Sequence, residues 1–103
     1  MWIFTNNGFI SIVADREDPE YGRLLVRSRD RDHLQNLFPN AKIFSKTPSD
    51  YRWRAWISRS EVAELLLSTV MSLNYTNFKA SIKDDRYHDA CLNVWEDMYT
   101  AYN

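Results

Sequence analysis

Glycine, proline and cysteine are scarce in this sequence, with two, three and one residues among 103. The single cysteine, Cys91, excludes an intramolecular disulfide, which favours a reducing compartment. No secretory signal is visible at the start, so we expect a cytoplasmic protein. The two glycines exclude the usual glycine-rich loop that cradles phosphates. With so little glycine and proline, long flexible linkers are not expected either.

Long hydrophobic runs are also missing. The longest apolar stretch, residues 62–73, is interrupted by a glutamate, two serines and a threonine, so it is too short and too polar to span a membrane. The sequence contains no Walker motif, nucleophile elbow or paired zinc-ligand motif. It therefore predicts a protein that is not an enzyme and that needs no cofactor or metal.

The sequence is rich in apolar and aromatic residues, which make up 45% and 15% of the chain. That proportion is enough for a packed core and too high for a disordered chain. A length of 103 residues suits one domain and leaves no room for a second of ordinary size. We therefore expect residues 1–103 to form a single domain.

Alternating apolar residues indicate five strands. Residues 2–5 and 9–15 flank Asn6-Asn7-Gly8, which is typical of a β-hairpin turn, and the other strands are residues 23–29, 41–46 and 51–58. Helical spacing indicates a short helix after the cap Asp30 and a helix from the capping box at residues 58–61 to about residue 73. It also indicates a short helix within residues 75–83 and an amphipathic helix over residues 85–102.

These elements predict an α+β fold in the order ββ-β-α-β-β-α-α. The simplest architecture is a single mostly antiparallel sheet of about five strands with helices on one face. The middle of the chain, β-α-β-β-α, matches part of a split β-α-β arrangement. The charged loop at residues 15–22 lacks the spacing and the central glycine of a calcium loop, so we expect its acidic residues to be solvated.

The formal net charge of −1 conceals a strong asymmetry along the chain. Residues 1–22 carry one basic and four acidic side chains, and residues 60–103 carry three basic and seven acidic ones. Residues 23–59, in contrast, carry nine basic and three acidic side chains. Because this segment holds three of the predicted strands, the cations are concentrated on the sheet.

Alternation divides the side chains of these strands between two faces. We expect Leu24 and Val26, together with residues 51, 53, 55 and 57, to face the helices. The opposite face would then carry seven cations and two aromatic residues: Arg23, Arg27, Arg29, Lys42, Lys46, Arg52, Arg54, Phe44 and Trp56.

Three interpretations of this basic face stay open. It is an open sheet face kept soluble by long charged side chains, or it binds an acidic protein, or it binds nucleic acid. Arginine forks suit phosphates and carboxylates, and exposed aromatic rings stack on bases. The overall charge of −1 counts against nucleic acid, because such binders usually have a strongly basic domain.

Two further clusters lie in the C-terminal third. Asp84, His88 and Cys91 are spaced to lie on one helical face, as zinc ligands or a Cys–His nucleophilic pair would, but a satisfied histidine and a small buried cysteine on a core stripe explain them more simply. Asn77 and Lys79 either contribute to a binding groove, or Asn77 caps the following helix while Lys79 stays in water. The simpler structural explanations are favoured for both clusters.

Several short motifs are familiar when taken together: MWIFT at residues 1–5, GFIS at 8–11, LLVRSR at 24–29, DYR at 50–52, YTNFK at 75–79, VW at 94–95 and MY at 98–99. This set resembles a family of small uncharacterised bacterial and phage proteins with no assigned activity. The resemblance spans most of the chain and implies a single cytoplasmic domain, but it implies no reaction.

The leading hypothesis is a non-enzymatic binding or adaptor domain that engages an acidic protein surface, with a phage-type inhibitor of a host protein as one concrete form. Its binding residues would be Arg27, Arg29, Phe44, Arg52, Arg54 and Trp56. Self-association is a second expectation, because the acidic C-terminal helix matches the basic face of another copy. The alternative is a single-stranded nucleic-acid-binding module that uses the same face.

Overall fold

The computed structural model describes residues 1–18, 20 and 22–103. Pro19 and Tyr21, which belong to the predicted charged loop, lie outside the described residues. Contacts group the chain into two compact units, Met1–Leu73 and Asn74–Asn103, and each is described by itself. That residues 1–103 form a single domain stays a prediction.

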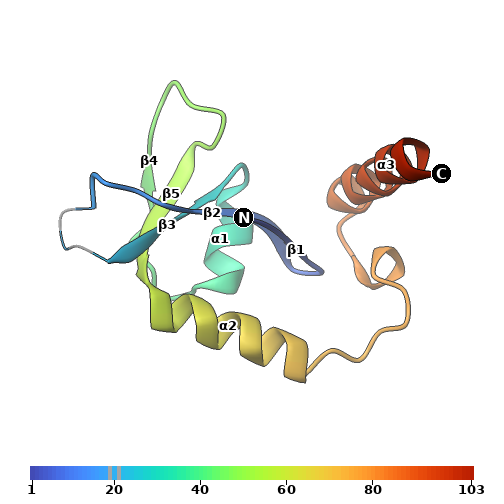
Figure 1. The fold of residues 1–103 in the computed structure, drawn as a ribbon, viewed down its shortest axis with the longest axis horizontal. Helices are drawn as coiled ribbons and strands as arrows, with labels where there is room; N and C mark the ends of the chain where they lie inside the picture. The colour runs from blue at the N-terminus through green and yellow to red at the C-terminus, as the bar shows by residue number, and fades with distance from the viewer. Residues whose placement is uncertain (19, 21) are drawn as a thin grey trace. The chain divides into compact units, whose positions relative to one another are not determined.

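The first unit is built on one five-stranded sheet (Figure 1). Its strands are β1 (Trp2–Thr5), β2 (Gly8–Ala14), β3 (Arg23–Ser28), β4 (Phe44–Ser45) and β5 (Trp53–Ser58). They lie in the order β1-β2-β3-β5-β4, and all neighbours are antiparallel. Because β5 inserts between β3 and β4, the middle of the chain has the split arrangement that the element order predicts. The predicted α+β fold with a five-stranded antiparallel sheet is confirmed.

Both helices of this unit begin at the predicted caps. The Asp30 side chain accepts a hydrogen bond from the backbone N–H of Asp32 at the start of α1 (Arg31–Leu37). The Ser58 hydroxyl accepts one from the N–H of Glu61 at the start of α2 (Arg59–Met71). Each cap satisfies a backbone donor that has no partner inside its helix, which fixes where the helix starts.

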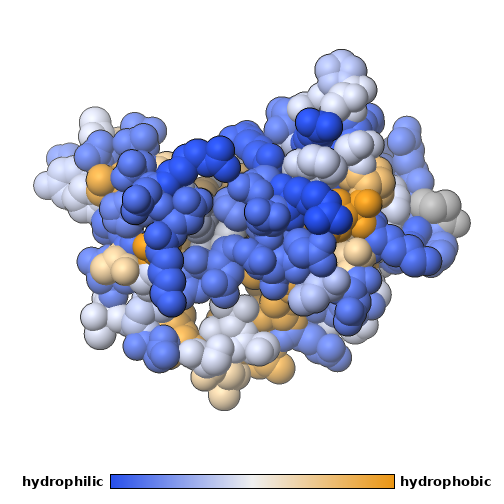
Figure 2. Space-filling model, turned by 180° about the vertical axis from the view of Figure 1, so that it is seen from behind, coloured by the Kyte–Doolittle hydropathy of each residue, from blue (hydrophilic) through white to orange (hydrophobic). Residues whose placement is uncertain are grey.

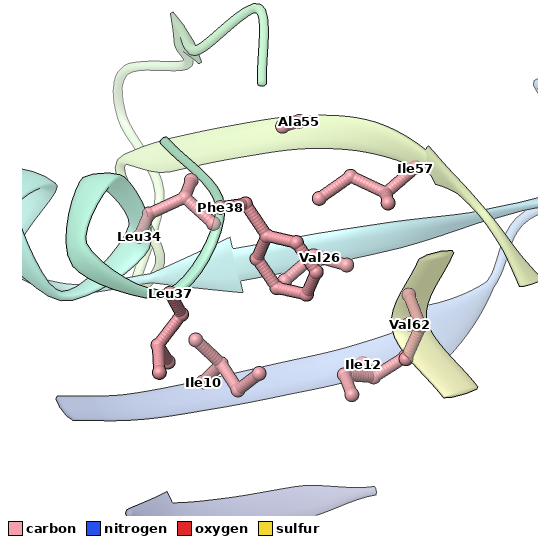
Figure 3. Packing of buried hydrophobic residues seen from close by; sticks show 9 residues of the cluster. All are labelled: Ile10, Ile12, Val26, Leu34, Leu37, Phe38, Ala55, Ile57 and Val62. Atoms are coloured by element: carbon pink, nitrogen blue, oxygen red, sulfur yellow. The ribbon is translucent and has the colours of Figure 1, made fainter. Parts of the chain in front are cut away.

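The core lies between one face of the sheet and these two helices (Figure 3). Leu34, Leu37 and Phe38 come from α1 and its end, and Val62 comes from α2. They pack on the alternate residues of the three central strands: Ile10, Ile12, Val26, Ala55 and Ile57. Helices therefore cover one face of the sheet, as predicted, and leave the other face without a helix of this unit.

The first two turns of α2 contribute to the core, through the buried Val62 and the partly buried Leu65 and Leu66. Val62 is the one buried residue among those of α2, whereas Leu67, Val70 and Met71 are exposed. Figure 2 shows hydrophobic residues along the lower edge of the view, where α2 lies. This helix is thus anchored at its N-terminal end and presents apolar side chains to solvent further along.

Two strands are shorter than their sequence patterns predict. β4 is limited to Phe44 and Ser45 instead of residues 41–46, because the chain before it turns to pack Ala41 and Ile43 against the core. β5 begins at Trp53 instead of residue 51. Strand alternation therefore does not extend to residues 51 and 52.

One acidic residue of the charged loop is buried, contrary to the prediction that the loop is solvated. The Asp18 carboxylate accepts hydrogen bonds from the backbone N–H groups of Glu20 (2.9 Å) and Arg23 (2.7 Å). It also accepts one from Nε of Arg23 at 3.1 Å and pairs with the same guanidinium at 3.0 Å. Asp18 thereby ties the loop to the start of β3.

Asp18 makes stability depend on pH. Burial raises its pKa, but the two backbone hydrogen bonds and the Arg23 charge outweigh burial and hold the pKa below 3.8. The pKa of the Asp18 carboxyl is therefore lower in the folded protein than in the unfolded chain. Its stabilisation of the fold is complete at pH values above the pKa in the unfolded chain, and it is lost as the pH falls through the pKa in the folded protein.

Asp18→Asn should therefore lower the free energy of unfolding at pH 7, because its amide NH2 would face the donors of Arg23. Urea unfolding from pH 7 to about pH 2 should show the difference from the wild type shrinking with acid. The exposed Glu17→Gln is the matched control and should show no such convergence. A difference that is constant with pH would contradict this role of the carboxylate.

The second unit contains a single 3-10 turn, η1 (Lys79–Ser81), and the long helix α3 (Asp85–Tyr102). The prediction of α3 is confirmed to the residue, whereas the short helix predicted within residues 75–83 is only this turn. Ile82, Tyr87 and Cys91 are buried. None of the helices that the structure describes is long and apolar enough to cross a membrane.

Candidate binding surface

The sheet face that α1 and α2 leave open carries one row of side chains across all five strands. Strand register pairs Trp2 with Ser11, Ser11 with Arg27, Arg27 with Arg54, and Arg54 with Phe44. Directly opposed residues of antiparallel strands point to the same face, so these five side chains share it. Leu25 and Trp56 form the neighbouring pair on the same face. Arg27, Arg54, Phe44 and Trp56 thus share the predicted face.

Two arginines of this face stack on a tyrosine that was predicted to lie on the other face. The guanidinium carbons of Arg27 and Arg29 lie 4.6 and 4.8 Å from the ring centroid of Tyr51, which is only 4% exposed. Tyr51 precedes β5, so the alternation of strand side chains does not apply to it, and its ring lies on the open face instead of in the core. The prediction that Tyr51 faces the helices is wrong for this reason.

Arg27 is held in place from a second side. Its Nη2 donates a hydrogen bond of 2.8 Å to the Ser11 hydroxyl in the adjacent strand. Its Nε is buried and has no partner among the described residues. Stacking and one hydrogen bond therefore fix the plane of this guanidinium without neutralising its charge.

Arg54 is mostly buried, and its guanidinium group makes hydrogen bonds within the fold. It is only 9% exposed, and its Nε donates to the carbonyl oxygen of Tyr51 at 3.0 Å. Its Nη2 donates to the Ser49 hydroxyl at 2.7 Å. These bonds tie the segment before β5 to the strand itself and hold Tyr51 beneath the two other arginines.

The remaining predicted residues are placed differently. Arg52 does not join the row: its guanidinium lies 4.7 Å from the ring centroid of Trp53, and Trp53 packs against the core. Trp56 is half-buried, and Arg23 lies 5.6 Å above its ring. Lys42 and Lys46 are exposed near β4, and neither belongs to a strand.

Sequence reasoning missed an aromatic group at the β1 end of the row. Phe4 and Phe9 are stacked with centroids 4.4 Å apart, and Phe9 contacts both Trp2 (6.3 Å) and Tyr51 (6.4 Å). Trp2 itself is 69% exposed. The signal was available in the hairpin pattern, because Trp2, Phe4 and Phe9 alternate with Ile3 and Ile10, which lie on the core side.

The charges on this surface are not compensated locally. Among the described residues, no carboxylate forms an ion pair with Arg27, Arg29 or Arg54, whereas Arg23 pairs with Asp18 and Glu20. Three guanidinium groups around one buried tyrosine therefore form an electropositive surface that favours an anionic partner. We refer to Trp2, Arg27, Arg29, Tyr51 and Arg54 as the cationic face.

The clusters of the second unit have local structural partners. Asn77 accepts a hydrogen bond from the N–H of Ala80 at 3.0 Å, as the capping interpretation predicts. His88 lies 3.2 Å from the Asp89 carboxylate. Among the described residues no three His, Cys, Asp or Glu side chains are grouped as a metal site requires. Burial raises the pKa of the Cys91 thiol, and its hydrogen bond with Tyr87 offsets this only in part, which disfavours the thiolate.

Comparisons with protein-family models, curated proteins and solved structures found no match for this chain. The family resemblance of the sequence therefore stays a prediction, and function has to be argued from the cationic face itself.

Proposed function

We propose that this protein is a non-enzymatic binding or adaptor domain whose cationic face engages an acidic protein surface. The observation that carries the proposal is the set of three guanidinium groups around Tyr51, none of which forms an ion pair with a carboxylate of the described residues. A phage-type inhibitor of a host protein is one concrete form, in line with the family that the sequence resembles.

The surroundings of these arginines suit a protein partner. Arginine, tryptophan and tyrosine are the residue types that most often anchor protein interfaces, and all three occur on the cationic face. Stacking on Tyr51 orders Arg27 and Arg29 before any partner arrives, so less side-chain entropy is lost on binding. Their planar forks can then accept carboxylates in a bidentate manner.

Arg29 is the residue that tests the proposal, because it is exposed and lies outside the strands. Arg29→Ala should weaken binding of fluorescent poly-L-glutamate roughly five- to tenfold, measured by anisotropy at low salt. Its free energy of unfolding should change by less than about 0.5 kcal/mol. Arg54→Ala should instead destabilise the fold, by about 1–3 kcal/mol, because it removes one buried and one partly buried hydrogen bond.

The matched control is Arg31→Ala, which removes the same charge from the exposed start of α1 on the covered side of the sheet. It should leave poly-L-glutamate affinity within about twofold of the wild type. Equal losses for Arg29→Ala and Arg31→Ala would mean that only net charge matters, and the cationic face would not be a site.

A single-stranded nucleic acid is the second candidate, and exposed rings at both ends of the row favour it. Trp2 is exposed at the β1 end and Phe44 at the β4 end. Aromatic stacking contributes about 1–3 kcal/mol per base in such modules. The test compares a deoxythymidine oligonucleotide with poly-L-glutamate of equal charge. If the oligonucleotide binds more tightly, and if Trp2→Ala lowers its affinity at least about tenfold, nucleic-acid binding replaces the leading proposal.

A further inference from the structure

Helix α3 exposes an apolar stripe along its last three turns. Val94, Trp95, Met98, Tyr99 and Tyr102 are 40 to 80% exposed, and they continue the helical stripe of the buried Tyr87 and Cys91. Isolated exposed apolar side chains are normal, but a contiguous aromatic stripe on one helix face marks an interaction surface.

The stripe is ordered within its own unit. The rings of Trp95 and Tyr99 are stacked with centroids 5.4 Å apart. The Lys79 ammonium group lies 4.9 Å from the ring centroid of Trp95. These contacts set the orientation of two large aromatic side chains before a partner binds, which lowers the entropic cost of binding.

The charges beside the stripe are almost all negative. At 100° per residue, Asp85 and Glu96 lie about 40° and 60° beyond Tyr99 at one edge of the stripe, and Asp97 lies about 60° beyond Val94 at the other edge. Asp89 lies further round, on the back of the helix. Arg86 is the only arginine or lysine among residues 85–102. The surface thus combines aromatic rings with carboxylates beyond both edges. It is complementary to the rings of the cationic face and to its guanidinium groups, which form no ion pair within the described part of the chain.

We propose that α3 of one copy docks on the cationic face of a second copy, so that two copies exchange their helices reciprocally. This proposal rests on the proposed function, because it uses the same face and names its acidic partner. A reciprocal exchange has twofold symmetry and closes as a dimer. An acidic host protein would then compete with α3 for one surface.

The dimensions of the two surfaces agree. The 18 residues of α3 extend for about 27 Å, and the five strands are about 19 Å across. Fully buried aromatic side chains cover about 150–250 Å² each, so the exposed parts of Trp95, Tyr99 and Tyr102 amount to roughly 300–450 Å². Each contact would bury this area on the helix and a similar area on the sheet. The two contacts of the dimer would therefore bury roughly 1,200–1,800 Å² in total, which is the size of a standard stable interface.

The test is a charge exchange between two full-length variants. Arg29→Glu reverses the charge of the cationic face, and Glu96→Arg reverses that of the acidic edge; both residues are exposed. Each variant alone brings like charges together and should raise the dimer dissociation constant at least about tenfold by analytical ultracentrifugation. An equimolar mixture of the two variants should form a heterodimer. In one of its contacts the wild-type Arg29 meets the wild-type Glu96, and in the other both charges are reversed, so both contacts pair opposite charges.

The matched controls are Arg31→Glu on α1 and Glu64→Arg on α2, which change the same charges away from both surfaces. They should dimerise like the wild type. Three results would each overturn the proposed helix exchange. The wild-type chain could stay monomeric up to about 1 mM, the single variants could dimerise normally, or the equimolar mixture could stay monomeric. A poly-L-glutamate complex sensitive to Arg29→Ala would still support the proposed function in every one of those cases.

Discussion

Gly8→Ala is expected to lower the free energy of unfolding by about 3–4 kcal/mol, since it combines overpacking with backbone strain. A Cβ at Gly8 would lie 2.6 Å from Cβ, 2.7 Å from Cγ and 2.9 Å from Cα of His33. The backbone φ of Gly8 is +153°, which side-chain-bearing residues rarely adopt. The neighbouring N–H of Phe9 donates a 3.2 Å hydrogen bond to Nδ1 of His33, so His33 cannot move aside without losing that bond.

Gly22→Ala is the matched control for this substitution. Gly22 also has a positive φ, +89°, but a Cβ there would meet no atom within 4 Å. Only the conformational cost of about 1–2 kcal/mol should therefore appear. Both variants can be compared with the wild type by urea unfolding followed through tryptophan fluorescence. Equal losses would show that the close approach of the hairpin to α1 contributes nothing.

Features that depend on residues close together in the sequence could be predicted well. Asn6-Asn7-Gly8 indicates the β1–β2 hairpin, Asp30 and Ser58 mark the starts of α1 and α2, and the bounds of α3 agree with the helical stripe. Each of these signals comes from turn geometry, a side-chain cap or the periodicity of one amphipathic segment. None of them requires knowledge of which strands become neighbours.

The cationic face was predicted only in part, because its organisation depends on contacts between distant residues. Alternation correctly placed Arg27 and Arg54 on one face. It failed at Tyr51, which precedes β5 and lies beneath Arg27 and Arg29, and at Arg52, whose guanidinium lies over the Trp53 ring. Arg54 ties the segment that contains Tyr51 to β5 through two hydrogen bonds, and no local pattern reveals those bonds.

The charged loop at residues 15–22 is a second place where the sequence alone was not enough, because a buried acidic residue depends on its partners in the fold. Composition alone makes an acidic loop look solvated, since single acidic residues usually stay in water. Asp18 is buried because Arg23, five residues later, provides both a backbone and a side-chain donor when β3 begins. Its role depends on the strand register and was visible only in three dimensions.

Leu34→Ala should cost about 3–5 kcal/mol of the free energy of unfolding, the second large effect that we expect. Leu34 is fully buried between α1 and the sheet, so truncation leaves a cavity in the core. The seven-residue α1 is too short to be stable alone and depends on Leu34, Leu37 and Phe38 for its attachment. Loss of this attachment should also loosen His33 over the hairpin, because His33 belongs to the same helix.

Leu67→Ala makes the same chemical change on an exposed helical position and serves as the control. Leu67 is 63% exposed on the part of α2 that projects beyond the core, so its truncation should change the free energy of unfolding by less than about 0.5 kcal/mol. Urea midpoints of the two variants measure the difference directly. A Leu34→Ala cost below about 1 kcal/mol would mean that α1 is not held by core packing. In that case the caps and the His33 hydrogen bond would have to hold α1 and the hairpin together.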